Sequence, residues 1–137
     1  MTGRVLGVDV GTVRVGLAVS DPLGATAQPL DVLPADDALD AIVERARDLD
    51  ASEIVVGLPL RTSGEHGPEA EAARQFARDI EEASGIPVHL WDERLSTVQA
   101  ERVMREQGHD ARRQRGSIDK VAAAVVLQSF LDARRPR

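Results

Sequence analysis

The order of extended and helical segments constrains the fold of this chain more than any other feature of the sequence. Two runs rich in β-branched residues, Val5–Val10 and Val15–Val19, flank a four-residue connection and predict a β-hairpin. We expect a third strand over Thr26–Leu33, and Pro29 places it at or near a sheet edge. Three strands before the first helix are unusual for a doubly wound dinucleotide fold, in which helices separate the strands from the outset.

Helices and strands alternate in the middle of the chain. Apolar residues spaced three and four apart predict helices over residues 37–49 and 70–80, and Gly85 is placed to end the second. Short apolar runs predict strands at Glu53–Leu58 and Ile86–Trp91. Strand-helix-strand units take right-handed crossovers, so we expect parallel pairing in this half of the sheet.

The C-terminal part of the chain predicts two further helices. Ser96 begins a capping-box pattern, and Gly108 would close the helix that it opens. We expect a basic loop over residues 109–116 and then a last helix, with Ser117 as its N-cap, that runs to about Ala133.

These elements predict an α/β domain with a mixed five-stranded sheet, a three-strand meander plus two parallel strands, flanked by helices. The 137 residues have room for one domain, 1–137, with a substantial core. The sequence shows no signal-peptide pattern, no apolar run of membrane-spanning length and no cysteine. We therefore expect a cytoplasmic protein without membrane contact, disulfides or cysteine-ligated zinc.

Charge is distributed unevenly along the chain. The net charge of -6 argues against a general nucleic-acid coat protein, which is usually basic. Residues 1–100 hold 8 Lys or Arg against 18 Asp or Glu, whereas residues 101–137 hold 9 against 5. A polyanion would therefore meet the C-terminal part, although solvated helix surfaces explain the same pattern.

Asp9 is the first candidate functional residue, because it lies in the most apolar strand of the sequence between Val8 and Val10. A buried carboxylate is strongly destabilising unless a cation or hydrogen bonds meet it. An ion pair with Arg14 across the hairpin would satisfy Asp9, and so would a metal ion. The surroundings of Asp9 in the sequence leave both interpretations open.

Two more acids are expected to converge with Asp9. Glu93 follows a predicted parallel strand at the end where open α/β sheets place their ligands, although a surface loop explains Glu93 taken alone. Asp119 is expected in the first turn of the last helix, where the macrodipole favours negative charge. It shares a helix face with small and apolar residues at offsets of 3, 4, 7 and 11, namely Ala122, Ala123, Val126 and Phe130. Asp119 is therefore predicted to point inward.

Three inward carboxylates without matching cations would repel one another at low dielectric. All-oxygen sites suit hard ions such as Mg²⁺ or Mn²⁺, and a pair of such ions supports phosphodiester hydrolysis. The pattern predicts a metal-dependent nuclease in which Asp9, Glu93 and Asp119 are both the metal ligands and the catalytic residues.

Four segments in this order resemble the signature of the YqgF/RuvX family, bacterial proteins described as Holliday-junction resolvases and as pre-16S rRNA nucleases. The segments are GVDVGTVRVGLAVSD at 7–21, IVVGLPL at 54–60, DERLST at 92–97 and DKVAA at 119–123. The resemblance covers nearly the whole chain. It implies an RNase H-like fold, with Asp9, Glu93 and Asp119 at the family's acidic catalytic positions.

The resemblance also implies that Arg14 and the turn Gly57-Leu58-Pro59 lie near the substrate. Val13 stands where many members carry Lys, and Ala122 leaves no fourth acid one turn after Asp119, unlike in RuvC resolvases. The basic side chains that we expect to contact substrate are Arg14, Arg61, Arg94, Arg112, Arg113, Arg115 and Lys120.

The preferred role is 5′-end processing of pre-16S rRNA in ribosome biogenesis, with Holliday-junction resolution as the alternative. Symmetric cutting of a junction calls for a two-fold dimer, so a homodimer is one expectation, with ribosomal particles as further partners. A second hypothesis is an ATP-binding module, since Asp9-Val-Gly-Thr12 resembles the phosphate loop of two-domain actin-type and sugar-kinase ATPases. A third is a non-catalytic nucleic-acid or ribosome-assembly factor, which would bind phosphates through a basic segment and the C-terminal arginines. These residues are Arg112, Arg113, Arg115, Lys120, Arg134, Arg135 and Arg137.

Overall fold

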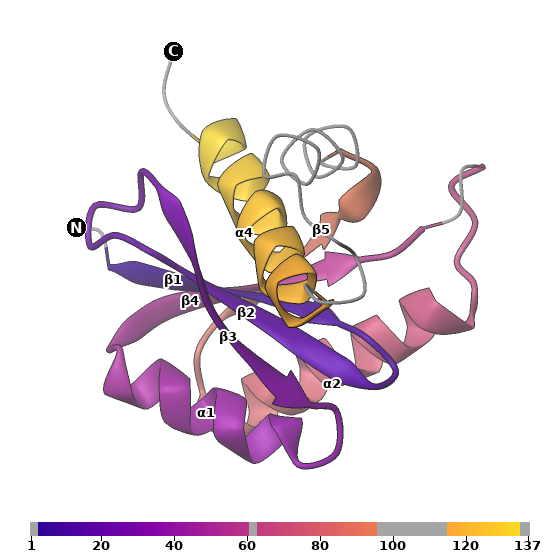
Figure 1. Ribbon diagram of the computed structural model, residues 1–137, viewed down its shortest axis with the longest axis horizontal. Coiled ribbons are helices and arrows are strands. Elements are labelled where there is room, and N and C mark those ends of the chain that lie inside the picture. Colours follow the sequence, from indigo (N-terminus) through magenta and orange to yellow (C-terminus); the bar gives the residue numbers. More distant parts are fainter. Residues whose placement is uncertain (1–2, 61–62, 96–114, 135–137) are drawn as a thin grey trace.

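The computed structural model shows a five-stranded sheet with helices on both faces (Figure 1). It describes residues 3–60, 63–95 and 115–134. The strands are β1 (Arg4–Val10), β2 (Arg14–Ser20), β3 (Ala27–Pro34), β4 (Ala51–Leu58) and β5 (Val88–Asp92). The helices are α1 (Ala38–Asp48), α2 (Pro68–Ser84) and α4 (Arg115–Arg134), and a 3-10 turn, η1 (Glu93–Leu95), follows β5.

The strand order is β3-β2-β1-β4-β5. Strands β1, β2 and β3 form the predicted antiparallel meander, and β4 and β5 extend it by parallel pairing. The predicted hairpin and mixed sheet are confirmed, and β3 lies at the sheet edge, as Pro29 indicated. Strand β1 is central, so its C-terminal end, where Asp9 lies, has a neighbouring strand on each side.

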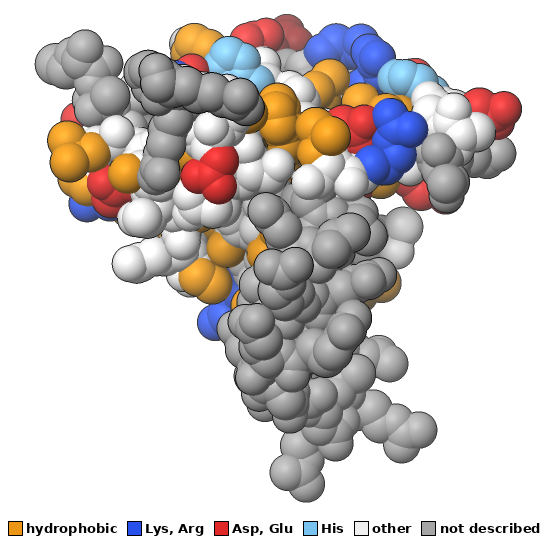
Figure 2. Space-filling model, turned by 90° about the horizontal axis from the view of Figure 1, so that it is seen from above, with side chains coloured by type: hydrophobic (Ala, Val, Ile, Leu, Met, Phe, Trp, Pro, Cys, Tyr) orange, Lys and Arg blue, Asp and Glu red, His pale blue; other side chains and the backbone are white. Residues whose placement is uncertain are grey.

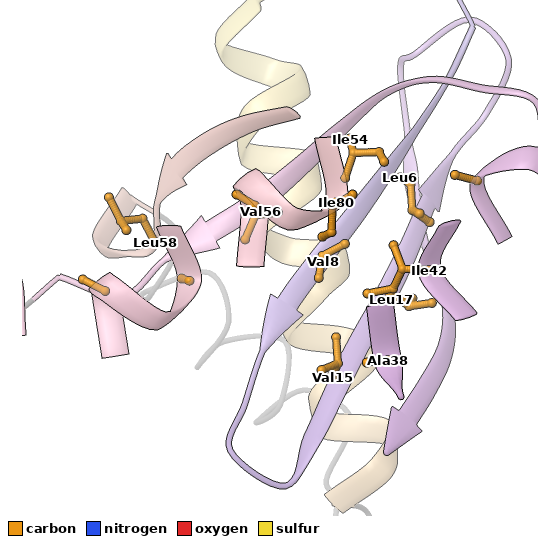
Figure 3. Packing of buried hydrophobic residues seen from close by; sticks show 14 residues of the cluster. Leu6, Val8, Val15, Leu17, Ala38, Ile42, Ile54, Val56, Leu58 and Ile80 are labelled. Carbon is orange, nitrogen blue, oxygen red and sulfur yellow. The ribbon is translucent and has the colours of Figure 1, made fainter. Parts of the chain in front are cut away.

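Two separate clusters of buried side chains cover the two faces of the sheet. Leu6 and Val8 of β1 point to the face covered by α1 and α2, where they pack with Ile42 of α1 and Ile80 of α2 (Figure 3). Val5 points to the opposite face and packs with residues of α4. Because side chains alternate along a strand, Gly7 and Asp9 share the α4 face with Val5.

Helices α1 and α2 lie where the spacing of apolar residues predicted helices. Gly85 ends α2 in a left-handed conformation with φ 73, as predicted. Helix α2 begins two residues before the predicted range, because Pro68 occupies its first turn. Proline suits that position, since its fixed φ matches the helix and its missing N–H has no partner there.

The start of α4 differs from the prediction. The helix begins at Arg115, so Gly116 and Ser117 lie inside it and Ser117 is not the N-cap. A Gly-Ser pair is a weak stop signal, because glycine in a helix interior is unfavourable by only about 1 kcal/mol relative to alanine. The first turn of α4 consequently contains no acid, so the placing of Asp119 there was wrong. The helix predicted from Ser96 to Gly108 and most of the basic loop lie outside the described residues.

The described helices include none with the length and apolar character needed to cross a membrane.

Candidate active site

Asp9 lies near the C-terminal end of β1, on the face that α4 covers. Its cross-strand partner on β2 is Gly16. On the other side Val8 pairs with Val56, so the next residue of β4, Gly57, lies beside Asp9. The carboxylate therefore has a residue without a side chain on each neighbouring strand, and this leaves space around it that two other elements enter.

The first of these elements is α4. A Cβ atom at Gly16 would lie 2.2 Å from the backbone carbonyl oxygen of Asp119, and one at Gly7 would lie 2.9 Å from Cβ of Leu127. Only glycine permits so close an approach of helix and strand. Gly7 and Gly16 thus let α4 lie directly on β1 and β2, with Asp119 beside the strand pair that carries Asp9.

The second element is η1, which begins at Glu93 where β5 ends. A Cβ atom at Gly57 would lie 2.7 Å from Oε1 of Glu93. The Glu93 side chain therefore crosses β4 over Gly57 toward Asp9 on the next strand, close enough for the two carboxyl groups to share a hydrogen bond when one of them is protonated. Residues far apart in the sequence meet in this way because Gly57 offers no side chain.

This contact changes the acidity of Glu93. The pKa of Glu93 is raised from 4.5 to about 9. Burial is the largest cause, and the hydrogen bond and negative charge of Asp9 and the charge of Asp92 add to it. A carboxyl group so shifted holds a proton at neutral pH, and that proton lets the two acids stay in contact.

Asp119 is held by a different partner. Nε of Arg14 donates to Oδ2 of Asp119 at 2.7 Å, and the side chains are 37% and 30% exposed. Arg14 and Gly16 point to the same face of β2, so the arginine reaches α4 from the mouth of the site. Asp119 points toward the sheet, as predicted, and Arg14 pairs with Asp119, whereas the ion pair considered from the sequence was with Asp9.

Arg94 is engaged with its own neighbour in the chain. Its guanidinium donates to both carboxylate oxygens of Asp92, with an Nη2 to Oδ2 distance of 2.7 Å. This contact lowers the pKa of Asp92, so the carboxylate stays ionised. The pair lies at the rim of the site, where a Cβ atom at Gly64 would be 3.4 Å from Nη1 of Arg94.

The structure thus brings the three predicted acids to one region, but not into one ligand cluster. Asp9 and Glu93 touch, and Asp119 is turned to Arg14. Within residues 3–60, 63–95 and 115–134, no three His, Asp or Glu side chains are arranged to share a metal ion. The donor set nevertheless fits a hard divalent cation, because two touching carboxylates supply only oxygen ligands and repel each other when both are ionised.

The other basic residues expected at the substrate are placed less completely. Lys120 is half-buried on α4 beside Asp119. Arg115 begins α4, while Arg61, Arg112 and Arg113 lie outside the described residues. On the face shown in Figure 2, the described basic side chains form small groups among acidic and hydrophobic ones, not one continuous patch.

Arg134 lies far from the acids. It is 15 residues after Asp119 on α4, or roughly 22 Å at the rise of an α-helix. Its Nη1 donates to Glu53 at 2.9 Å, and its guanidinium covers the ring of Phe130 at 5.0 Å. His89 contacts the other oxygen of Glu53 at 2.9 Å. This cluster fastens the end of α4 to β4 and β5.

The roles of Gly7 and Gly16 were not predicted from the sequence. Both stand inside predicted strands, where glycine is unfavourable unless another backbone approaches closely. Their position on the face of Asp9, two residues before it and opposite it, was the available signal.

Comparison with known proteins agrees with the fold. RuvC from T. thermophilus, solved in complex with a Holliday junction substrate, matches with a TM-score of 0.60 over 96% of this chain and 95% of that chain. A second T. thermophilus RuvC structure gives a TM-score of 0.58. Both are 18% identical to this chain, and they show that the fold is RNase H-like, as predicted.

Sequence relatives are much closer. A protein from Anaeromyxobacter sp. (strain K) is 50% identical over 97% of this chain and 99% of its own length. One from Pelotomaculum thermopropionicum is 45% identical over 98% of this chain and 90% of its own length. Both carry the name "Putative pre-16S rRNA nuclease". The profile of the RuvX family, described as Holliday junction resolvase, matches residues 3–133. The chain therefore belongs to the RuvX family and is a nuclease.

Proposed function

We propose that this nuclease is a divalent-metal-dependent endonuclease that processes the 5′ end of pre-16S rRNA. The observation that carries the proposal is the contact between Asp9 and Glu93, with the pKa of Glu93 raised to about 9. Two carboxyl groups held together in a half-buried position are unfavourable for the folded protein unless a ligand binds them. A divalent cation would be coordinated by both carboxylates, because it favours the ionised form of each.

Mg²⁺ or Mn²⁺ is the cation that this oxygen-only site favours, and it supplies a polarised water and charge stabilisation for the leaving oxygen. Asp9 and Glu93 would hold it. Asp119, next to the β1–β2 strand pair, would be the third acidic ligand. The chain's own contribution is to fix these oxygens on three rigid elements, β1, η1 and α4, before substrate arrives.

The basic residues around the acids would hold the substrate. Arg14 and Lys120 flank Asp119, and Arg94 lies on the other rim next to Glu93. Guanidinium groups bind phosphate oxygens through paired hydrogen bonds, so the two arginines are suited to grip the backbone of a strand from both sides of the acids.

Support for pre-16S rRNA comes from the relatives, whose name states this substrate. Support for the alternative, Holliday-junction resolution, comes from the family description. The proposed role in ribosome biogenesis implies a cytoplasmic protein that meets ribosomal particles, whereas junction resolution would require a homodimer.

A cleavage assay with two substrates tests the proposal. Purified protein is incubated with Mg²⁺ or Mn²⁺ and either a pre-16S rRNA fragment carrying the 5′ precursor or a four-way DNA junction. We expect site-specific cutting of the RNA that chelation stops and Asp9→Asn abolishes. Cutting of the junction alone would establish the alternative role, and RNA binding without cleavage would favour the non-catalytic factor.

A further inference from the structure

The ion pair between Arg14 and Asp119 stands at the mouth of the candidate active site. Only Nε of Arg14 is used in it, at 2.7 Å from Oδ2 of Asp119. Its Nη1 and Nη2 make no hydrogen bond to any other residue that the structure describes. About a third of each side chain is exposed, so solvent and ions reach the pair.

The backbone of Asp119 is already near Asp9. Its carbonyl oxygen lies against Gly16, which is the direct cross-strand partner of Asp9. Directly opposed residues in an antiparallel pair have Cα atoms about 4.5–5.5 Å apart. We therefore infer that a rotation of the Asp119 side chain, without movement of α4, turns its carboxylate from Arg14 toward Asp9 when a cation binds.

The charges around the acids are balanced in pairs. Arg94 pairs with Asp92 and Arg14 pairs with Asp119, while the carboxyl groups of Asp9 and Glu93 lie next to each other. A cation held by Asp9 and Glu93 would attract the Asp119 carboxylate and repel the Arg14 guanidinium. The two effects act in the same direction, against the Arg14–Asp119 pair.

We propose that Arg14 is the internal counter-ion of the metal-free site, exchanged for a divalent cation at Asp119 and thereby released to bind a substrate phosphate. The inference rests on the metal site of the proposed function. It couples the two ligands, because Nε of Arg14 and the full guanidinium charge become available for phosphate when the cation has taken the Asp119 carboxylate. Arg14 is then a positioning residue for Asp119 before the cation binds and a substrate-binding residue afterwards.

Calorimetric titration with Mn²⁺ alone, without nucleic acid, tests the exchange. Arg14→Gln removes the competitor for Asp119, so we expect this variant to bind Mn²⁺ about fivefold more tightly than the parent, the scale of a partly exposed ion pair. Arg14→Lys retains the charge without the planar guanidinium, and its affinity should lie between the two. If Arg14 only held Asp119 in place as a structural contact, Arg14→Gln would bind Mn²⁺ equally or more weakly, and the proposal would be overturned.

The Asp119→Asn background separates exchange from a general effect of charge. Loss of one positive charge near the site strengthens cation binding slightly in any background, whereas relief of competition requires the Asp119 carboxylate. We expect Arg14→Gln to raise Mn²⁺ affinity only slightly when Asp119→Asn is already present, far less than the roughly fivefold gain in the parent background. An equal gain in both backgrounds would overturn the exchange.

The outcomes for this inference and for the proposed function are distinguishable. A parent protein that binds Mn²⁺ with the expected order of variants but cuts no pre-16S rRNA would contradict the substrate while supporting the exchange. A parent that cuts the RNA, with Mn²⁺ affinity unchanged by Arg14→Gln, would contradict the exchange alone. A parent that binds no Mn²⁺ would contradict both.

Discussion

The Glu93 carboxylate lies over the backbone of Gly57, so closely that a Cβ atom there would be 2.7 Å from Oε1. The path of Glu93 to Asp9 therefore depends on a residue that carries no functional group. This relationship links the sequence of β4 to the chemistry of the site, and it leads to the first prediction.

Gly57→Ala should reduce nuclease activity by about a hundredfold, since a displacement of about 1 Å in a catalytic group has an effect of this size. The neighbour that must move is the end of a flexible side chain, so the melting temperature should change little. Cleavage rates and thermal unfolding of the variant test both parts.

Gly3→Ala is the matched control. A Cβ atom at Gly3 would also lie 2.7 Å from a side-chain oxygen, Oγ of Ser52, but at the opposite end of the strands from Asp9. We expect full activity from this variant. Equal loss of activity in both variants would mean that crowding in general, and not the position of Glu93, causes the defect.

Gly16→Ala should lower the free energy of unfolding. Its Cβ would meet the Asp119 carbonyl oxygen at 2.2 Å, and this neighbour is backbone. Helix α4 must shift as a unit, so we expect a loss of about 1–3 kcal/mol in the free energy of unfolding, the usual range for overpacking. Urea denaturation, with an unchanged m-value, measures it. Unaltered stability would contradict the direct contact of α4 with β2.

The stability of the metal-free protein should fall as pH rises. The pKa of Glu93 is raised from 4.5 to about 9 in the folded state, so the folded state binds the extra proton between these values. Its stabilising contribution is complete below the unfolded pKa of about 4.5 and is lost as pH rises toward about 9. Melting temperatures measured in EDTA from pH 5 to pH 9 should show this decline, and Glu93→Gln should flatten it. An identical decline in Glu93→Gln would assign it to other groups.

Mg²⁺ should stabilise the protein, because a ligand that binds only the folded state raises the melting temperature. At a hundredfold excess over the dissociation constant the gain is about 2.7 kcal/mol. Asp9→Asn should lose this response, while Asp31→Asn, which removes an acid paired with Arg45 away from the site, should keep it. A response retained in Asp9→Asn would place the cation elsewhere.

The sequence was sufficient to predict the sheet because its signals are local. Alternating β-branched runs, helical stripes and Gly85 each act within a few residues, and the structure confirms all of them. The start of α4 was predicted wrongly because Gly116 and Ser117 carry only weak preferences, which the long apolar helix after them overrides.

The pairing of charges within the site could not be predicted in the same way. From the sequence, Arg14 is five residues from Asp9 and 105 from Asp119, yet it pairs with Asp119. The close packing of α4 on Gly7 and Gly16 brings Asp119 to Arg14. Packing between elements that are distant in the sequence cannot be predicted from local sequence patterns. The role of the three acids as site residues stays a prediction, whereas the ion-pair partner of Asp119 became visible only in the fold.

A crystal structure with Mn²⁺ tests the metal site most directly, because anomalous scattering identifies the ion and its ligands together. We predict an anomalous peak bound by carboxylate oxygens of both Asp9 and Glu93, with their mutual hydrogen bond broken. A structure at saturating Mn²⁺ in which Asp9 and Glu93 remain hydrogen-bonded to each other, with no peak between them, would contradict the proposed metal site.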